Sequence, residues 1–431
     1  MTMKKFTFTL FAFCLFDFAQ SMLLPSAFVH SQWVQQTVPV SKPITGIKFI
    51  DSLKGWACTD YGTQHDTCYI IYTSNGGTNW VIQNSQYNTI FQSMNMIDAS
   101  TGYVGGYAFS PGPGTIIVKT TDGGLNWTTI PAGTSSGVTD MYFLNADSGY
   151  MCSSLFINLY TTTNGGQNWE LRTNGINASV YRLFFLNYNT GYAGAASNLY
   201  KTTNAGLSWF QLSPFSSETV YAVYFFDELT GFIGLTNHQI GKTTNGGSNW
   251  NIKHVFDPRP EVISDIYFVN NNTGYAGTGW LQRILKTTDA GLNWGYQIVS
   301  TGSIRISVLN DLNVWSAQYG ISRTTNGGGN IVYEDVKQIS GNVPEDYKLY
   351  QNYPNPFNPS TKIKYDLPQK ENVNVKVFDV LGNEIKTIVN ESQNGGSYEA
   401  EWDASYYPSG IYFARLTAGE YAKTIKMILI K

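Results

Sequence analysis

Thr120-Thr-Asp-Gly-Gly-Leu-Asn-Trp127 is one of seven near-copies of a phrase that recurs about every forty residues along the chain. The other copies begin at Thr73, Thr162, Thr202, Thr243, Thr287 and Thr324, and the last copy lacks the final tryptophan. The spacings between successive tryptophans are 80→127 (47), 127→169 (42), 169→209 (40), 209→250 (41) and 250→294 (44). Such a period with strand-like patterning is typical of a β-propeller, in which each repeat forms one four-stranded blade. The sequence therefore predicts an all-β fold dominated by a seven-bladed propeller.

Each repeat opens with a β-branched and aromatic run, as in residues 138–145 and 220–227. A Gly-Tyr or Gly-Phe pair then opens the second strand, the third strand runs into the repeated turn, and the tryptophan opens the fourth. Near-continuous apolar runs such as Tyr224-Phe225-Phe226 indicate a strand buried on both faces, which is the environment of the innermost strand of a blade.

The repeated turn has a clear physical basis. An Asn or Asp side chain bonds backbone groups nearby in the chain, and glycine adopts positive φ without steric cost. The phrase resembles the Asp-box, or BNR repeat, of sialidases, sortilin-like receptors and other propellers. Each copy carries one acidic or amide side chain, whereas a calcium loop supplies six to eight oxygens. The turn is therefore expected to be structural, with no metal and no cofactor.

The seventh copy ends at Gly329-Asn330-Ile331 without a tryptophan, yet Trp33-Val-Gln-Gln36 matches the start of a fourth strand. The spacing from Trp33 to Trp80 is 47, equal to the longest internal spacing. The N-terminal strand is therefore predicted to complete the last blade and to close the ring, which removes an open sheet edge.

Charged residues are only 13% of the 431 residues and aromatic residues reach 15%, which favours a many-stranded protein with large buried aromatic surfaces. The formal net charge is −3 and no basic run is present, which argues against nucleic acid or an anionic membrane as partner.

The N-terminal residues are predicted to be a secretion signal. Lys4 and Lys5 precede an apolar run, residues 6–16, which is too short to span a bilayer. Small residues that end at Ser31 fit a cleavage site, so residues 1–31 are assigned as the signal peptide. The mature chain has no transmembrane segment in this interpretation and is expected to be secreted.

Three cysteines follow the signal: Cys58, Cys68 and Cys152. Cys58 and Cys68 lie across a predicted hairpin, and export favours oxidation, so a Cys58–Cys68 disulfide is a candidate. Cys152 would remain a buried thiol. Only four histidines are present and they are scattered, so no metal site is predicted.

From about Tyr347 the repeat stops, and alternating apolar residues such as Val373, Val375 and Val377 indicate a small β-sandwich. Residues 347–431, with the phrase Tyr353-Pro-Asn-Pro-Phe-Asn-Pro359 and a lysine at the end, resemble the C-terminal sorting domain of type IX secretion in Bacteroidetes-like bacteria. The resemblance implies handling by the type IX machinery and a secreted or outer-surface location. The expected boundaries are 1–31 signal, 32–332 propeller, 333–346 linker and 347–431 sorting domain.

The propeller resembles the photosystem II assembly factor family, on the evidence of Gly274-Tyr-Ala-Gly277 and the following Lys286-Thr-Thr-Asp289. In its photosynthetic members this family binds assembly intermediates and is not enzymatic. The resemblance implies a propeller fold and a binding function here, whereas a photosystem role does not suit a protein with an outer-membrane sorting domain.

Ligands of propellers usually meet the mouth of the central channel, which we expect at the face where the inner strands begin. Aligning the seven inner strands places these residues at one equivalent position, the ring position: Gly46, Ser93, Asp140, Arg182, Ala222, Asp265 and Arg305. The charged members Asp140, Arg182, Asp265 and Arg305 are the candidate binding residues. The alternative is that Asp140–Arg182 and Asp265–Arg305 are two structural ion pairs screened by channel water.

Three functions remain open from the sequence. The first is a secreted module that binds an extracellular protein or glycan and has no catalytic residues. The second is a glycoside hydrolase, which requires two carboxyl groups that Asp140 and Asp265 would supply. The third is a purely structural surface protein. A binding protein, not an enzyme, is the preferred interpretation.

Overall fold

The computed structural model describes residues 32–60, 66–110, 113–153, 157–212, 215, 218–255, 261–279, 282–329, 331, 336–340, 342–404 and 407–431. The predicted signal peptide, residues 1–31, lies outside the described residues, as do Asn330 and residues 332–335.

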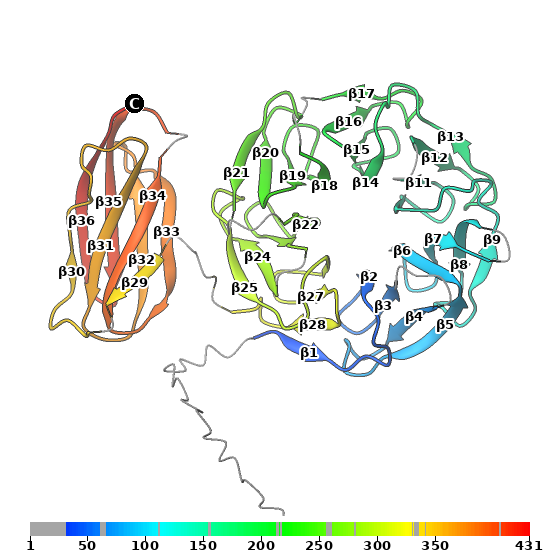
Figure 1. Ribbon diagram of the computed structural model, residues 1–431, viewed down its shortest axis with the longest axis horizontal. Coiled ribbons are helices and arrows are strands. Elements are labelled where there is room, and N and C mark those ends of the chain that lie inside the picture. Colours follow the sequence, from blue (N-terminus) through cyan, green and yellow to red (C-terminus); the bar gives the residue numbers. More distant parts are fainter. Residues whose placement is uncertain are drawn as a thin grey trace, which may run out of the picture. The chain divides into compact units, whose positions relative to one another are not determined.

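Within the described residues, seven four-stranded antiparallel sheets follow the repeats, and Figure 1 shows them around a ring with β2, β6, β14, β18 and β22 toward its centre. The innermost strands are β2 (Ile44–Phe49), β6 (Thr89–Met96), β10 (Asp140–Phe143), β14 (Val180–Phe185), β18 (Val220–Phe225), β22 (Asp265–Phe268) and β26 (Arg305–Val308). The second strands are β3 (Gly55–Thr59), β7 (Gly102–Ala108), β11 (Gly149–Ser153), β15 (Gly191–Ala195), β19 (Gly231–Leu235), β23 (Gly274–Gly277) and β27 (Val314–Ala317). The third strands are β4 (Thr67–Thr73), β8 (Gly114–Thr120), β12 (Asn158–Thr162), β16 (Asn198–Thr202), β20 (Gln239–Thr243), β24 (Arg283–Thr287) and β28 (Ile321–Thr324). The outer strands are β5 (Val81–Tyr87), β9 (Thr128–Ile130), β13 (Glu170–Leu171), β17 (Phe210–Gln211), β21 (Asn251–His254), β25 (Gly295–Ile298) and, for blade seven, β1 (Val34–Gln36).

Stacked aromatic rings join neighbouring blades. The ring of the Gly-Tyr pair in one blade lies flat on an aromatic ring of the next inner strand, with a centroid distance of 3.7 Å for Tyr103 on Phe143. The same contact recurs for Tyr150 on Phe185, Tyr192 on Phe225, Phe232 on Phe268 and Trp315 on Phe49. A Cβ at Gly149 would lie 2.5 Å from the ring of Phe143, so this position requires glycine. The aromatic residue of each pair is therefore explained by packing between blades, and the glycine by close contact with the inner strand of its own blade.

The seven repeated turns share one hydrogen-bond pattern. The hydroxyl of the first threonine accepts the N–H of the glycine four residues later, as in Thr202 with Gly206 at 2.9 Å. The equivalent bonds involve Thr73, Thr120, Thr162, Thr243, Thr287 and Thr324. The Asn or Asp side chain accepts a second N–H, as in Asn204 with Ser208 at 3.0 Å. The polar groups of the turn are thus used within the turn, which supports its structural role.

We expect Thr202→Val to destabilise the propeller by about 1–3 kcal/mol, because it leaves the buried N–H of Gly206 without its acceptor. Urea denaturation followed by tryptophan fluorescence measures this change. The exposed hydroxyl of Thr78 provides the control, since Thr78→Val should change stability by less than about 0.5 kcal/mol. Equal effects of the two substitutions would contradict this explanation of the turn.

The N-terminal strand closes the ring as the sequence predicts. β1 pairs with β28, with Val34 opposite Arg323 and Gln36 opposite Ile321. The Trp33 indole lies over Gly328 just as Trp80 lies over Gly77 in the first blade. Its Nε1 donates to Oε1 of Gln297 at 3.1 Å. Trp33 therefore occupies the place of the tryptophan that the seventh repeat lacks.

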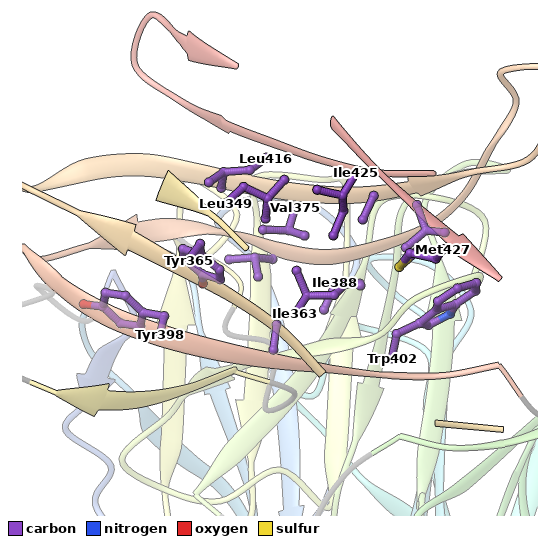
Figure 2. Packing of buried hydrophobic residues seen from close by; sticks show 14 of the residues in the cluster. Leu349, Ile363, Tyr365, Val375, Ile388, Tyr398, Trp402, Leu416, Ile425 and Met427 are labelled. Atoms are coloured by element: carbon purple, nitrogen blue, oxygen red, sulfur yellow. The ribbon is translucent and has the colours of Figure 1, made fainter. Parts of the chain in front are cut away.

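The C-terminal part is a two-sheet β-sandwich with strand orders β29-β34-β31-β30 and β33-β32-β35-β36. Its strands are β29 (Val336–Ser340), β30 (Lys348–Leu349), β31 (Ser360–Leu367), β32 (Glu371–Phe378), β33 (Glu384–Gln393), β34 (Gly396–Asp403), β35 (Gly410–Ala418) and β36 (Tyr421–Leu429). Figure 2 shows its core, in which Ile363 and Trp402 from one sheet pack with Val375 and Leu416 from the other.

The predicted linker, residues 333–346, requires a correction. Residues 336–340 form β29, which pairs with β34 and extends one sheet of the sandwich. A five-residue edge strand has little periodic signal of its own, and its pairing partner lies about sixty residues further along the sequence. The sequence analysis placed the start of the sandwich at Tyr347, but its first strand lies before this residue.

The candidate disulfide is not formed. Cys58 lies opposite Ile70 in the ladder, so Cys58 and Cys68 are diagonal neighbours, and the two sulfurs are not bonded. The Cys68 thiol donates to the carbonyl of Thr89 at 2.7 Å. Burial raises the pKa of Cys58 to about 12, so its thiol stays protonated. Cys152 is a buried thiol.

Candidate functional site

The ladder register confirms that the seven ring residues are equivalent. Each pairs with a small residue of the second strand: Gly46 with Cys58, Ser93 with Gly105, Asp140 with Cys152, Arg182 with Gly194, Ala222 with Gly234, Asp265 with Gly277 and Arg305 with Ala317. Cys58 and Cys152 thus belong to a set of small residues that is glycine or alanine in the other repeats.

Asp140 is buried and its carboxylate joins three blades. Oδ1 accepts the hydroxyl of Ser93 at 3.0 Å, and Oδ2 accepts the backbone N–H of Leu183 at 2.9 Å. The guanidinium of Arg182 lies 3.7 Å from Oδ1, with only 15% of the arginine side chain and 10% of the aspartate side chain exposed. The first predicted ion pair is therefore present and largely shielded from water.

The Arg182 side chain extends well beyond this pair. Its Nε donates to the carbonyl of Tyr221 at 3.0 Å, and Nη2 donates to the carbonyl of Ser264 at 2.6 Å. These carbonyls belong to blades five and six, whereas Asp140 belongs to blade three. One side chain of blade four thus connects three other blades.

Asp265 and Arg305 do not form the second predicted ion pair. The Asp265 carboxylate instead accepts the N–H of Ile306 at 3.1 Å, and Arg305 donates to the carbonyls of Thr45 at 2.9 Å and Ile304 at 3.2 Å. Burial and the nearby positive charge of Arg182 lower the pKa of Arg305 to about 10.

These contacts follow one rule. A carboxylate or hydroxyl group at the ring position accepts a backbone N–H from the next blade, and the donor is the residue directly after that blade's own ring residue. Ser93, for example, accepts the N–H of Met141 at 2.9 Å. Arginines at the ring position donate to carbonyls that precede it. The innermost strand of each blade has an unpaired edge that faces the channel, and such peptide groups need partners. The ring residues supply them, so this layer stabilises the fold; we call it the ionic layer.

A cavity of about 560 Å³ occupies the channel next to the ionic layer. Asp140, Arg182 and Asp265 line one end of it, and Ile50, Ile97, Leu144 and Leu309 line the other. Every lining residue lies at the ring position or after it in its strand, so the cavity extends toward the ends of the inner strands. The sequence prediction had placed the site on the opposite side, where these strands begin.

Four aromatic side chains line one wall of this cavity: Tyr142, Phe184, Tyr224 and Tyr267. They come from consecutive blades, two residues after the ring position, and their successive centroids are 5.9, 5.5 and 5.6 Å apart. Tyr142 and Tyr224 also donate their hydroxyls to carbonyls of the next blade, at Phe185 and Phe268. We call this wall the aromatic arc.

Lys48 and Asn95 occupy the same position in blades one and two and line the same cavity. Burial lowers the pKa of the Lys48 ammonium, and the negative charge of Asp265 opposes this shift. A lysine in a partly desolvated cavity is costly to keep charged, which marks it as a candidate functional residue.

The mouth of the cavity is apolar. The residues four positions after the ring position are all aliphatic or aromatic and partly buried: Ile50, Ile97, Leu144, Leu186, Phe226, Val269 and Leu309. We call them the apolar collar, of which Ile50, Ile97, Leu144 and Leu309 line the cavity. The next residue of each blade is Asp or Asn, and its side chain accepts backbone N–H groups of the hairpin, as Asp51 does from Leu53 and Lys54.

Sequence reasoning missed Lys48 and the aromatic arc, although a signal existed. Side chains alternate along a strand, so the residue two positions after the ring position faces the same channel. Four successive blades carry an aromatic residue there.

Among the described residues, no group of three or more His, Cys, Asp or Glu side chains is placed to hold a metal ion.

Comparison with protein families identifies the C-terminal part. Residues 351–431 match the family described as the secretion system C-terminal sorting domain. This domain directs the protein to type IX secretion, with a secreted or cell-surface location in Bacteroidetes. No helix in the described part of the protein is long and apolar enough to cross a membrane. Curated protein sequences include no significant match to this one.

Solved structures similar to this protein are propellers. The structure titled "YCF48 bound to D1 peptide" is 19% identical, with a TM-score of 0.55, and the match covers 69% of this chain and 97% of that one. YCF48 from Cyanidioschyzon merolae is 18% identical, with a TM-score of 0.51 and coverage of 68% and 98%. The GH74 xyloglucanase from Xanthomonas campestris is 10% identical, with a TM-score of 0.52 and coverage of 92% and 68%. At these identities the similarity shows the fold alone.

Proposed function

We propose that the exported propeller is a binding protein whose partner, a protein or a glycan outside the cell, enters the channel cavity. The observation that carries this proposal is the cavity itself, about 560 Å³, bounded by the ionic layer and the aromatic arc. Its volume lies in the range of about 300–1,000 Å³ that is usual for ligand sites. The YCF48 structure titled as bound to a D1 peptide adds support, because a propeller of similar fold binds a peptide.

Tyr267 offers a direct test, since 39% of this residue is exposed and it lies in the aromatic arc. The mature protein, residues 32–431, is screened on arrays of extracellular proteins and glycans, and each partner is measured again with Tyr267→Ala. We expect affinity to fall about tenfold, which corresponds to about 1.4 kcal/mol. Tyr87, on the outer strand of blade one and 61% exposed, gives the matched control Tyr87→Ala, which should bind normally.

Binding that is unchanged in Tyr267→Ala would place the partner elsewhere on the surface and reject the cavity. The absence of any partner on the arrays would favour the purely structural alternative.

Glycoside hydrolysis is the alternative function, favoured by the similar fold of the xyloglucanase. It requires two carboxyl groups that flank the glycosidic bond. Here the carboxylates of Asp140 and Asp265 accept backbone N–H groups of the next blade, and Asp140 is also paired with Arg182. These contacts support a structural role for both groups, and we propose that the protein is not an enzyme. Turnover of xyloglucan by the wild type, lost in Asp140→Asn with Asp265→Asn, would overturn this conclusion.

A further inference from the structure

The Lys48 ammonium differs from the other cations of the channel. Arg182 and Arg305 donate to backbone carbonyls of neighbouring blades. In contrast, within the described residues no hydrogen bond and no ion pair reaches the ammonium of Lys48, although burial already lowers the pKa of this group. A partly buried charge without a hydrogen-bond or ion-pair partner carries a desolvation cost that a bound anion would offset.

The charged groups in and beside the cavity carry an excess of positive charge, which also favours a bound anion. Lys48 and Arg182 line the cavity together with Asp140 and Asp265, and Arg305, which interacts electrostatically with Arg182 and with both aspartates, adds a third positive charge beside it. One positive charge therefore remains, and it belongs to the group that has no fixed partner. A ligand with a single carboxylate complements this arrangement.

The remaining lining groups favour a peptide over a glycan. A sugar presents several hydroxyls that need hydrogen-bond partners, but the hydroxyls of Tyr142 and Tyr224 already donate to backbone carbonyls. The ionic layer is likewise engaged in bonds between blades. The apolar collar at the mouth, by contrast, suits aliphatic and aromatic side chains of a polypeptide.

We propose that the channel cavity binds a polypeptide segment whose apolar side chains contact the apolar collar and the aromatic arc and whose carboxylate pairs with Lys48. This inference rests on the proposed function and names the ligand class of the same site. The carboxylate comes from an acidic side chain or from the free C-terminus of the ligand, and both have the same chemistry. Because the ionic layer bounds one end of the cavity, the carboxylate lies at the deep end of the ligand.

Three matched sets of apolar hexapeptides test the proposal with the mature protein, residues 32–431. One set carries a single glutamate and an amidated C-terminus, the second carries glutamine and an amidated C-terminus, and the third carries glutamine and a free C-terminal carboxylate. We expect wild type to bind one of the two carboxylate sets at least tenfold more tightly than the neutral set. Which set is preferred identifies the source of the carboxylate.

Substitutions of Lys48 connect this preference to the cavity. Lys48→Met should abolish the preference without lowering the melting temperature, because it removes an unpaired charge, and Lys48→Arg should retain the preference. Lys54, an exposed lysine on the same blade, provides the matched control Lys54→Met, which should behave as wild type.

Three results would overturn the proposal. The first is a carboxylate preference that survives Lys48→Met, and the second is no preference at all among the three sets. The third is binding of an oligogalacturonate in place of the peptides. Each of them leaves the proposed function standing if a partner still requires Tyr267, so failure of this proposal and failure of the proposed function can be distinguished.

Discussion

Removal of residues 32–36 is expected to lower the unfolding free energy of the propeller by at least about 3–5 kcal/mol, the usual cost of truncating a buried tryptophan. Trp33 is only 5% exposed and packs in the core between blades six and seven, with Tyr275 and Ile306. The deletion also removes the pairing of β1 with β28 and exposes that strand as a new sheet edge. Urea denaturation followed by tryptophan fluorescence measures the loss.

Single substitutions distinguish the contribution of the Trp33 indole to stability from that of the paired strand β1. Trp33→Ala should account for most of the effect, because it also leaves Oε1 of Gln297 without its donor. The neighbouring Val34 is 63% exposed, so Val34→Ala should cost less than about 0.5 kcal/mol. A deletion variant as stable as wild type would show that closure by β1 contributes nothing to the ring.

Arg182→Met is expected to destabilise the propeller by about 3–5 kcal/mol, because removal of one partner of a buried ion pair leaves the other charge uncompensated. The substitution leaves the Asp140 carboxylate without its ion-pair partner and the carbonyls of Tyr221 and Ser264 without their hydrogen-bond donor. As a candidate binding residue of the sequence analysis, Arg182 would be needed for partner binding and not for the fold. The contacts of Arg182 with three other blades lead us to expect a loss of stability instead.

The exposed pair of Arg172 with Glu170 provides the control for this experiment. The glutamate side chain is 70% exposed, so Arg172→Met should cost less than about 1 kcal/mol. In the double variant Asp140→Leu with Arg182→Met no charge is left unpaired, so the combined cost should be smaller than the sum of the single costs. Strict additivity would show that the two groups do not interact.

The fold could be predicted from the sequence because its determinants are local and repeated. The turn around Thr202 uses its own side chains, so the phrase alone defines it. Trp33 could be assigned to blade seven because its neighbours repeat the phrase after Trp80. The edge strand β29 could not, since it is defined by its partner β34 and not by a pattern of its own.

The site was predicted less well, for a physical reason. The charged ring residues were found by alignment, but their partners are mostly backbone groups of other blades, such as the N–H of Ile306 for Asp265. Every residue except proline has such a group, so residue identity does not reveal the contact. A ring of charges therefore suggested a binding site, whereas the contacts between blades that these charges make could not be read from the sequence. Lys48 and Tyr267, which line the cavity beside the ionic layer, lie two residues after the ring position. Counting along the strands could therefore have predicted that they face the channel.

Closure by β1 also determines the order in which the propeller can be completed. Trp33 bonds Gln297 across 264 positions of the sequence, whereas the other strands of each blade pair with neighbours in the same repeat. Contacts between residues far apart in the sequence form slowly, because closing a long loop costs entropy before the contact is gained. β1 is synthesised first but must wait for the last repeat before it gains a partner, and until then blade seven lacks its outer strand. The closed ring is thus evidence that every intervening repeat has been made, and a polypeptide interrupted before β28 is left with an unpaired strand at its start.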